Sequence, residues 1–207
     1  MIIKHVKEKV ESKNSVLHIT AILAHSLMFR GTTRDKFIRD NLDWLTKASN
    51  WAKFAAIASF GVIHLGHHKK GMKLFEPYLP GANARGGPYL EGGALYGLGL
   101  IHANRGGDKA DYLMDCLRNA RDNEIIQHGA CLGLGLNAMS TSREDIYEAL
   151  KDRLNQDNAI TGEACGMSMG LVFLGSGHSP AITEMFAYAR ETPHEKIVRT
   201  QETVEYV

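Results

Sequence analysis

The sequence has almost no net charge and few cysteines, and each scarcity excludes a class of protein. Its 24 Lys and Arg residues face 23 Asp and Glu residues, so the 207 residues carry a formal net charge of +1. A chain so evenly balanced lacks the positive field that attracts nucleic acid or anionic lipid, and we expect neither partner. The three cysteines, Cys116, Cys131 and Cys165, share no short spacing, which indicates a reducing compartment without disulfides.

Long hydrophobic runs and strand patterns are also missing. The longest apolar run, residues 92–101, falls well short of the roughly 20 residues that span a bilayer. Residues 1–15 are charged, and they lack the apolar core and the cleavage site of a secretory signal. No run of alternating β-branched residues is long enough to predict a sheet. The sequence therefore predicts a soluble, all-helical protein that is not exported.

What the sequence has instead is an internal repeat rich in small residues. Gly99 in the stretch Glu91–His102 aligns with small residues at intervals of 35, 38, 36 and 35 residues. A period in this range is typical of an array of supersecondary units that stack on one another. The small residues that we expect to pack helices together are Ser26, Gly61, Gly93, Gly97, Gly99, Gly133, Gly135 and Gly170.

Each repeat is predicted to contain two helices of different character. The glycine-rich helix around residues 92–101 is apolar nearly all round, which favours burial on every side. Each glycine inside it costs about 1 kcal/mol relative to alanine, so close helix packing must offset that cost. The second helix is amphipathic, because Ala110, Leu113, Met114 and Leu117 fall at i, i+3, i+4 and i+7. The pattern predicts an α-α superhelix (solenoid) of about five helix pairs.

The ends of the array differ from its middle. We assign residues 1–13 to a charged N-terminal segment, 14–199 to the repeat domain and 200–207 to a divergent tail. Continuing the 35-residue step would place Glu205 where the repeat needs a glycine. We therefore expect that residues 200–207 form no sixth repeat and leave the fifth repeat partly uncovered around Met167, Leu171 and Phe173, so that the chain self-associates or needs a partner.

Two glycine clusters allow a second interpretation, a nucleotide-binding enzyme. Residues 97–99 and 133–135 begin like a dinucleotide fingerprint, but His102 and Ala138 stand where its third glycine belongs. No predicted strand precedes either cluster, although a phosphate-binding loop needs one. Helix packing is the favoured interpretation, and we assign no cofactor-binding residue.

The histidines and cysteines do not form a recognisable metal site or catalytic dyad either. His64 and His102 occupy equivalent repeat positions and His67 is followed by His68, but these spacings do not form the close ligand pairs typical of zinc sites. A dyad of His128 with Cys131 would lack an orienting third group and an oxyanion hole. The sequence assigns neither a metal ligand nor a catalytic residue.

The repeat consensus Gly-Ala-x-x-Gly-Leu-Gly-Leu resembles the proteasome/cyclosome repeat family over about residues 14–199. Longer strings are similar to the large non-ATPase scaffolds of the proteasome regulatory particle in that family. These strings are Asp40–Leu45, Asn50–Phe54, Glu91–Asn104 and Thr192–Ile197.

The resemblance implies a fragment of a much longer helical scaffold, in which the repeats close into a toroid. It implies no catalytic activity and no cofactor. It further implies an enzyme regulator in ubiquitin-dependent protein catabolism that holds ATPases, ubiquitin receptors and a deubiquitinase in the cytoplasm and nucleus. A free-standing helical-repeat adaptor that binds other proteins is the alternative of a different kind, together with the nucleotide-binding enzyme.

Overall fold

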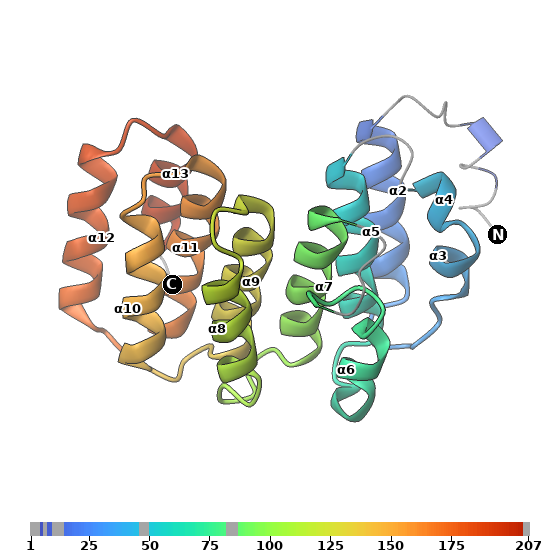
Figure 1. The fold of residues 1–207 in the computed structure, drawn as a ribbon, viewed down its shortest axis with the longest axis horizontal. Helices are drawn as coiled ribbons and strands as arrows, with labels where there is room; N and C mark the ends of the chain where they lie inside the picture. The colour runs from blue at the N-terminus through green and yellow to red at the C-terminus, as the bar shows by residue number, and fades with distance from the viewer. Residues whose placement is uncertain (1–4, 6–7, 10–14, 46–49, 82–86, 205–207) are drawn as a thin grey trace. The chain divides into compact units, whose positions relative to one another are not determined.

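The computed structural model describes residues 5, 8–9, 15–45, 50–81 and 87–204, and all regular secondary structure in these residues is helical (Figure 1). The helices are α2 (Ser15–Met28), α3 (Lys36–Asp40), α4 (Leu42–Leu45), α5 (Asn50–Ile63), α6 (His68–Phe75), α7 (Pro88–Ile101), α8 (Ala110–Asn119), α9 (Glu124–Asn137), α10 (Glu144–Leu154), α11 (Ala159–Val172), α12 (Ser179–Glu191) and α13 (Glu195–Val204). Within the described ranges, no helix has the length and apolar character needed to cross a membrane.

The chain folds as two compact halves, Met1–Ile101 and His102–Val207. In the N-terminal half, α2, α5 and α7 pack side by side in chain order, and α6 packs against α7. In the C-terminal half, α9, α11 and α13 form one layer, while α8 and α10 pack on α9 and α11. The helices of each half thus form a sequential array, as the prediction of an all-helical repeat requires. We call α2, α5, α7, α9, α11 and α13 the inner helices.

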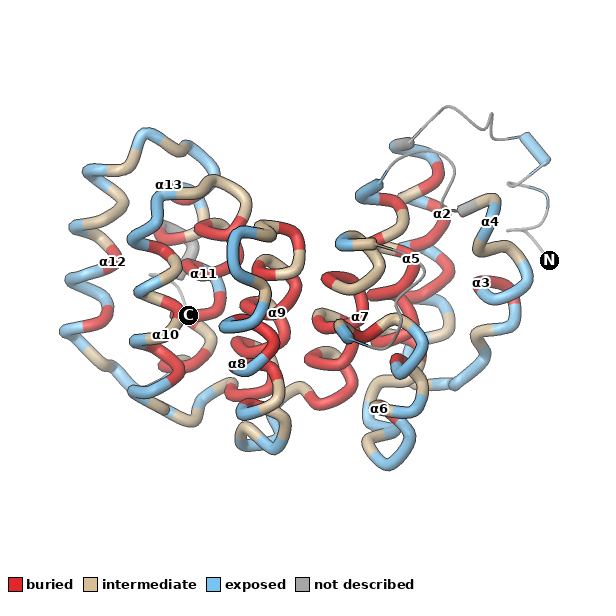
Figure 2. The backbone as a smooth tube through the Cα atoms, in the orientation of Figure 1, coloured by how far each residue is buried: buried red, intermediate tan, exposed pale blue. Residues whose placement is uncertain are grey.

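The two kinds of helix differ in burial as predicted (Figure 2). Inner helix α7 is buried along most of its length, including its four glycines and Leu95, Leu98 and Ile101. Helix α8 buries its predicted stripe and exposes its other face. Burying large apolar side chains contributes roughly 1.5–3 kcal/mol each, so these layers supply most of the stabilisation.

The expectation for the end of the array was wrong in part. Helix α13 continues through Arg199 to Val204 and packs on α11, so Thr200 and Gln201 do help to cover the fifth repeat. Ile197, Thr200 and Gln201 lie over glycines of α11, and these longer side chains fill the space that a small-residue helix would otherwise occupy. Phe173 is buried, whereas Met167 is 45% exposed. Glu205, residues 82–86 and most of residues 1–13 lie outside the described residues.

A buried histidine makes the N-terminal half sensitive to acid. His25 on α2 is 1% exposed and packs against the rings of Phe29 and Phe37, with ring centroids 4.7 and 4.9 Å away. Burial lowers the pKa of His25, and the charge of Asp35 only partly opposes this. Because the unfolded chain binds the proton more readily, the contribution of His25 to stability is complete above about pH 6.5 and is lost as the pH falls toward its folded pKa.

We therefore expect the thermal unfolding midpoint to drop between about pH 7 and pH 5.5 and the His25→Phe variant to show a smaller drop. The phenyl ring keeps the aromatic packing but cannot take up a proton. His5→Phe is the control, because His5 is exposed. Circular dichroism melts at a series of pH values measure the effect, and identical pH profiles for His25→Phe and the unaltered chain would contradict it.

Candidate functional site: the repeat interfaces and a basic pocket

Helices α5 and α7 touch through their backbones at two places. A Cβ atom added to Gly61 would lie 2.4 Å from the carbonyl oxygen of Gly97 and 2.7 Å from its Cα. A Cβ added to Gly93 would lie 2.5 Å from the carbonyl oxygen of Phe54. Such distances are far below van der Waals contact, so glycine at these positions is what lets the two helices come together.

The same contact recurs between α9 and α11 in the C-terminal half. A Cβ added to Gly135 would lie 2.6 Å from the Cα of Ser168. Gly61 and Gly135 are equivalent positions in the repeat, and so are Gly97 and Ser168. In both halves, the residue that aligns with Gly99 in one repeat (Gly61 or Gly135) therefore contacts the small residue two positions before the aligned position in the next repeat (Gly97 or Ser168). Ser168 adds polarity to the contact, because its hydroxyl donates to the carbonyl of Cys131 at 2.8 Å.

The remaining small residues are all buried on inner helices. The Phe75 ring of α6 covers Gly97, and the Ser26 hydroxyl donates to the Leu23 carbonyl one turn earlier in α2, at 2.9 Å. Gly99, Gly133 and Gly170 lie within α7, α9 and α11. The glycine clusters at 97–99 and 133–135 are thus inside helices rather than in loops before a helix, and the backbone N–H groups that a phosphate needs are bonded within the helix. The nucleotide-binding interpretation has no support in this geometry.

A second repeated contact was not visible in the sequence. A loop that follows one inner helix donates two N–H groups to the last two carbonyls of the next inner helix. The pairs are Gly31 to Val62, Thr33 to Ile63, Asn104 to Leu136, Gly107 to Asn137, Ser140 to Leu171 and Ser142 to Val172, with N···O distances of 2.9–3.1 Å. The last carbonyls of a helix have no partner inside it, so each loop caps the helix that follows.

The caps require unusual loop conformations. Thr33, Asn104 and Ser140 have φ values of 62°, 55° and 59°, in the left-handed region that is sparsely populated by residues other than glycine. A small polar residue shortly after the inner helices α2, α7 and α9 is the sequence signal that could have revealed this contact.

Asn137 anchors a polar network at one of these junctions. Its side chain is fully buried, its amide donates to the carbonyl of His102 at 3.0 Å and to Asp108 at 2.7 Å, and its oxygen accepts from the backbone N–H of Lys109 at 2.9 Å. Asp108 also bonds the His102 ring at 2.9 Å. Partial burial of Asp108 raises its pKa, but the bonds from Asn137 and His102 outweigh burial and lower it overall.

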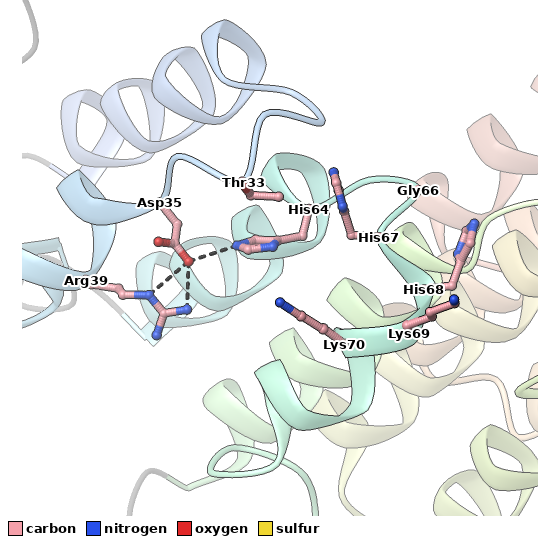
Figure 3. A pocket seen from close by; sticks show the side chains of 9 residues that line it. All are labelled: Thr33, Asp35, Arg39, His64, Gly66, His67, His68, Lys69 and Lys70. Carbon is pink, nitrogen blue, oxygen red and sulfur yellow. Dashed lines mark hydrogen bonds and ion pairs between the residues drawn. The ribbon is translucent and has the colours of Figure 1, made fainter.

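A basic pocket of about 740 Å³ lies in the N-terminal half, between the start of α3, the end of α5 and the start of α6 (Figure 3). Its lining residues are Thr33, Asp35, Arg39, His64, Gly66, His67, His68, Lys69 and Lys70. One oxygen of Asp35 accepts from the Arg39 guanidinium at 2.7 and 2.9 Å and contacts the His64 ring at 2.9 Å. Burial raises the pKa of Asp35, but these bonds outweigh burial and lower it overall, which keeps the carboxylate charged.

The histidines and cysteines singled out in the sequence are held in separate contacts. His64 and His102 each bind a carboxylate of the same half of the chain, and His67 contacts the Gly31 carbonyl. In the residues that the structure describes, no three His, Cys, Asp or Glu side chains are arranged to hold a metal ion.

His128 and Cys131 have different partners. The His128 ring contacts the Ile160 carbonyl at 2.7 Å, whereas the Cys131 sulfur lies 3.5 Å from that of Cys165. Burial raises the pKa of the Cys165 thiol. Because His128 and Cys131 contact different groups, this geometry gives no support to a catalytic dyad.

No protein-family model matches the chain, but curated proteins match nearly all of it. The 26S proteasome non-ATPase regulatory subunit 1 homolog B of Arabidopsis thaliana is 55% identical over 96% of this chain and 20% of its own length. The corresponding subunit of Drosophila melanogaster is 52% identical over 96% of this chain and 19% of its own length. The regulatory subunit RPN2 of Saccharomyces cerevisiae is 45% identical over 93% of this chain and 21% of its own length. The chain therefore spans about a fifth of the length of these relatives.

Proposed function

We propose that this chain, which is homologous to about a fifth of the 26S proteasome non-ATPase regulatory subunit 1, acts as a non-catalytic scaffold segment of the proteasome regulatory particle. The observation that carries the proposal is 44–55% identity to such subunits over nearly the whole chain. These matches confirm the family resemblance that was inferred from the repeat and the longer strings. The relatives are named as non-ATPase subunits, in keeping with a role that involves no ATP hydrolysis.

The repeat interfaces suit a scaffold because they fix neighbouring helices in two independent ways. Backbone contact at Gly61 and Gly135 leaves no room for one inner helix to slide along the next. At α9 and α11, the loop after α9 also caps the end of α11 by two hydrogen bonds, and two further loops cap the ends of α5 and α9 in the same way. A surface formed by the remaining helices of either half, which pack on the inner helices, is therefore held in a fixed position.

As partners of the whole scaffold we propose other proteasome subunits, and more specifically the ATPases, ubiquitin receptors and a deubiquitinase. The corresponding location is the cytoplasm and the nucleus. A free-standing adaptor is less favoured, because the relatives that match nearly the whole chain are named as proteasome regulatory subunits.

A chimaera tests this function. The matching segment of the yeast RPN2 subunit is replaced by this chain, and the regulatory particle is purified through another subunit. We expect the chimaera to be incorporated, whereas the same chimaera carrying Gly61→Leu and Gly135→Leu should be lost from the particle because both repeat interfaces are broken. Absence of the unaltered chimaera from the particle, despite its accumulation in the cell, would contradict the proposal.

A further inference from the structure

The basic pocket contains a sequence feature that the repeat does not explain. Residues 67–70 read His-His-Lys-Lys, whereas the aligned segments 32–35, 105–108, 141–144 and 176–179 of the other four repeats each contain a single basic residue. The packing features described above recur from repeat to repeat, since each junction needs them. A basic run present in one repeat only is therefore not required for stacking.

The charges of the pocket are unequal even after its internal ion pairs are formed. Of the described residues, Asp35 supplies the one carboxylate in the lining, and it is shared by Arg39 and His64. Three side chains with permanent positive charge line the pocket against this single negative charge, which leaves two net positive charges. In Figure 3, Lys70 extends from α6 toward His64 and Arg39. A concave surface of one charge sign concentrates ligands of the opposite sign.

The lining also restricts the kind of anion. Every lining side chain carries a charged or polar group, and Gly66 has no side chain, so the pocket offers several groups that can bind polar atoms of a ligand. About 740 Å³ is a volume that holds several residues of a peptide rather than one inorganic ion. Arg39 is the side chain whose planar fork best matches phosphate, and its Nε and Nη2 atoms are already directed at Asp35. The remaining lysines are compact point charges, which suit carboxylates approaching from different directions.

We propose that this pocket binds an acidic segment of a partner protein, with Lys69 and Lys70 as the main contacts for its Asp and Glu side chains and His67 and His68 beside them. The proposed contacts are made by side chains that line the pocket, not by the glycine contacts between inner helices, and the site goes beyond the scaffold function. Its test uses the chain alone, so the outcome does not depend on assembly into a proteasome.

The test measures fluorescence anisotropy of a labelled peptide that alternates Glu with Gly, titrated with the full chain at low and at physiological ionic strength. We expect saturable binding that weakens with salt and no binding of a matching Lys-Gly peptide. The variant K69E/K70E should bind at least about tenfold more weakly, because two attractive charges become repulsive. The control R105E/R190E makes the same change in net charge at two exposed positions outside the pocket, and it should bind like the unaltered chain.

Circular dichroism checks that each variant is folded, and K69Q/K70Q replaces the reversal if K69E/K70E does not fold. Equal weakening in the lysine variant and the control would overturn the proposal, because it would show attraction to net charge alone. The absence of binding to the unaltered chain would overturn it as well. Displacement of the peptide by inorganic phosphate at equal or lower concentration would assign the pocket to phosphate instead and would also refute an acidic-peptide site.

Discussion

Gly61→Ala is expected to lower the free energy of unfolding of the N-terminal half by about 3 kcal/mol, although it adds a single methyl group. The new Cβ would lie 2.4 Å from the carbonyl oxygen of Gly97, and backbone atoms cannot move aside as the end of a side chain can. Alanine is a better helix former than glycine by about 1 kcal/mol, but that gain is smaller than the cost of separating α5 from α7.

Gly166→Ala is the matched control, because it makes the same substitution in the middle of another inner helix. A Cβ at this position meets Thr200 Oγ1 at 3.1 Å and Gln201 Cγ at 3.2 Å, which belong to side chains of α13 that can shift. We expect this variant to differ from the unaltered chain by less than about 1 kcal/mol. Urea denaturation followed by circular dichroism compares the two variants. Similar denaturation midpoints for them would show that the backbone contact at Gly61 is not rigid.

Asn137→Ala is expected to cost about 3 kcal/mol by a different mechanism, the loss of hydrogen bonds in a buried network. The variant leaves the His102 carbonyl and the Lys109 N–H without the bonds that the amide provides, and unsatisfied buried groups cost roughly 1–3 kcal/mol each.

Asn119→Ala tests whether loss of any asparagine has the same consequence. Asn119 ends α8 and is exposed, so we expect its removal to leave the thermal unfolding midpoint almost unchanged. If both asparagine variants melt at the temperature of the unaltered chain, then water replaces the amide of Asn137 and the network does not stabilise the junction.

The helical layers were predictable because their signals are local. The stripe Ala110, Leu113, Met114 and Leu117 needs only the helical period to be recognised, and the glycine spacing directly marks α5, α7, α9 and α11 among the inner helices. The partner of each glycine was not predictable. Helical spacing shows which faces of a helix are small, but the pairing of Gly61 with Gly97 depends on how far one helix is displaced along the other.

Three other features could not be predicted from the sequence, for physical reasons. Helix α13 was missed because the expectation demanded small residues, whereas a terminal helix can cover glycines with side chains such as Ile197. The pairing of Asp35 with His64 joins the residue before α3 to the residue after α5, 29 positions apart, and no local pattern encodes such a contact. The basic run at residues 67–70 can be read from the sequence, but the pocket that it lines cannot.

The loop caps give the array a polarity along the chain. In the N-terminal half, the loop after α2 donates hydrogen bonds to the end of α5. In the C-terminal half, the loop before α8 donates to the end of α9, and the loop after α9 donates to the end of α11, so each loop acts on a helix later in the chain. Removing an earlier repeat would therefore uncap the next one, whereas removing a later repeat would leave the caps of the earlier ones intact. During synthesis, the loop N–H groups leave the ribosome before the helix carbonyls that they bind. Each of these inner helices is therefore synthesised after the loop that caps its end. Unfolding that begins at the N-terminal side of either half should accordingly spread forward more readily than unfolding that begins at its other side spreads back.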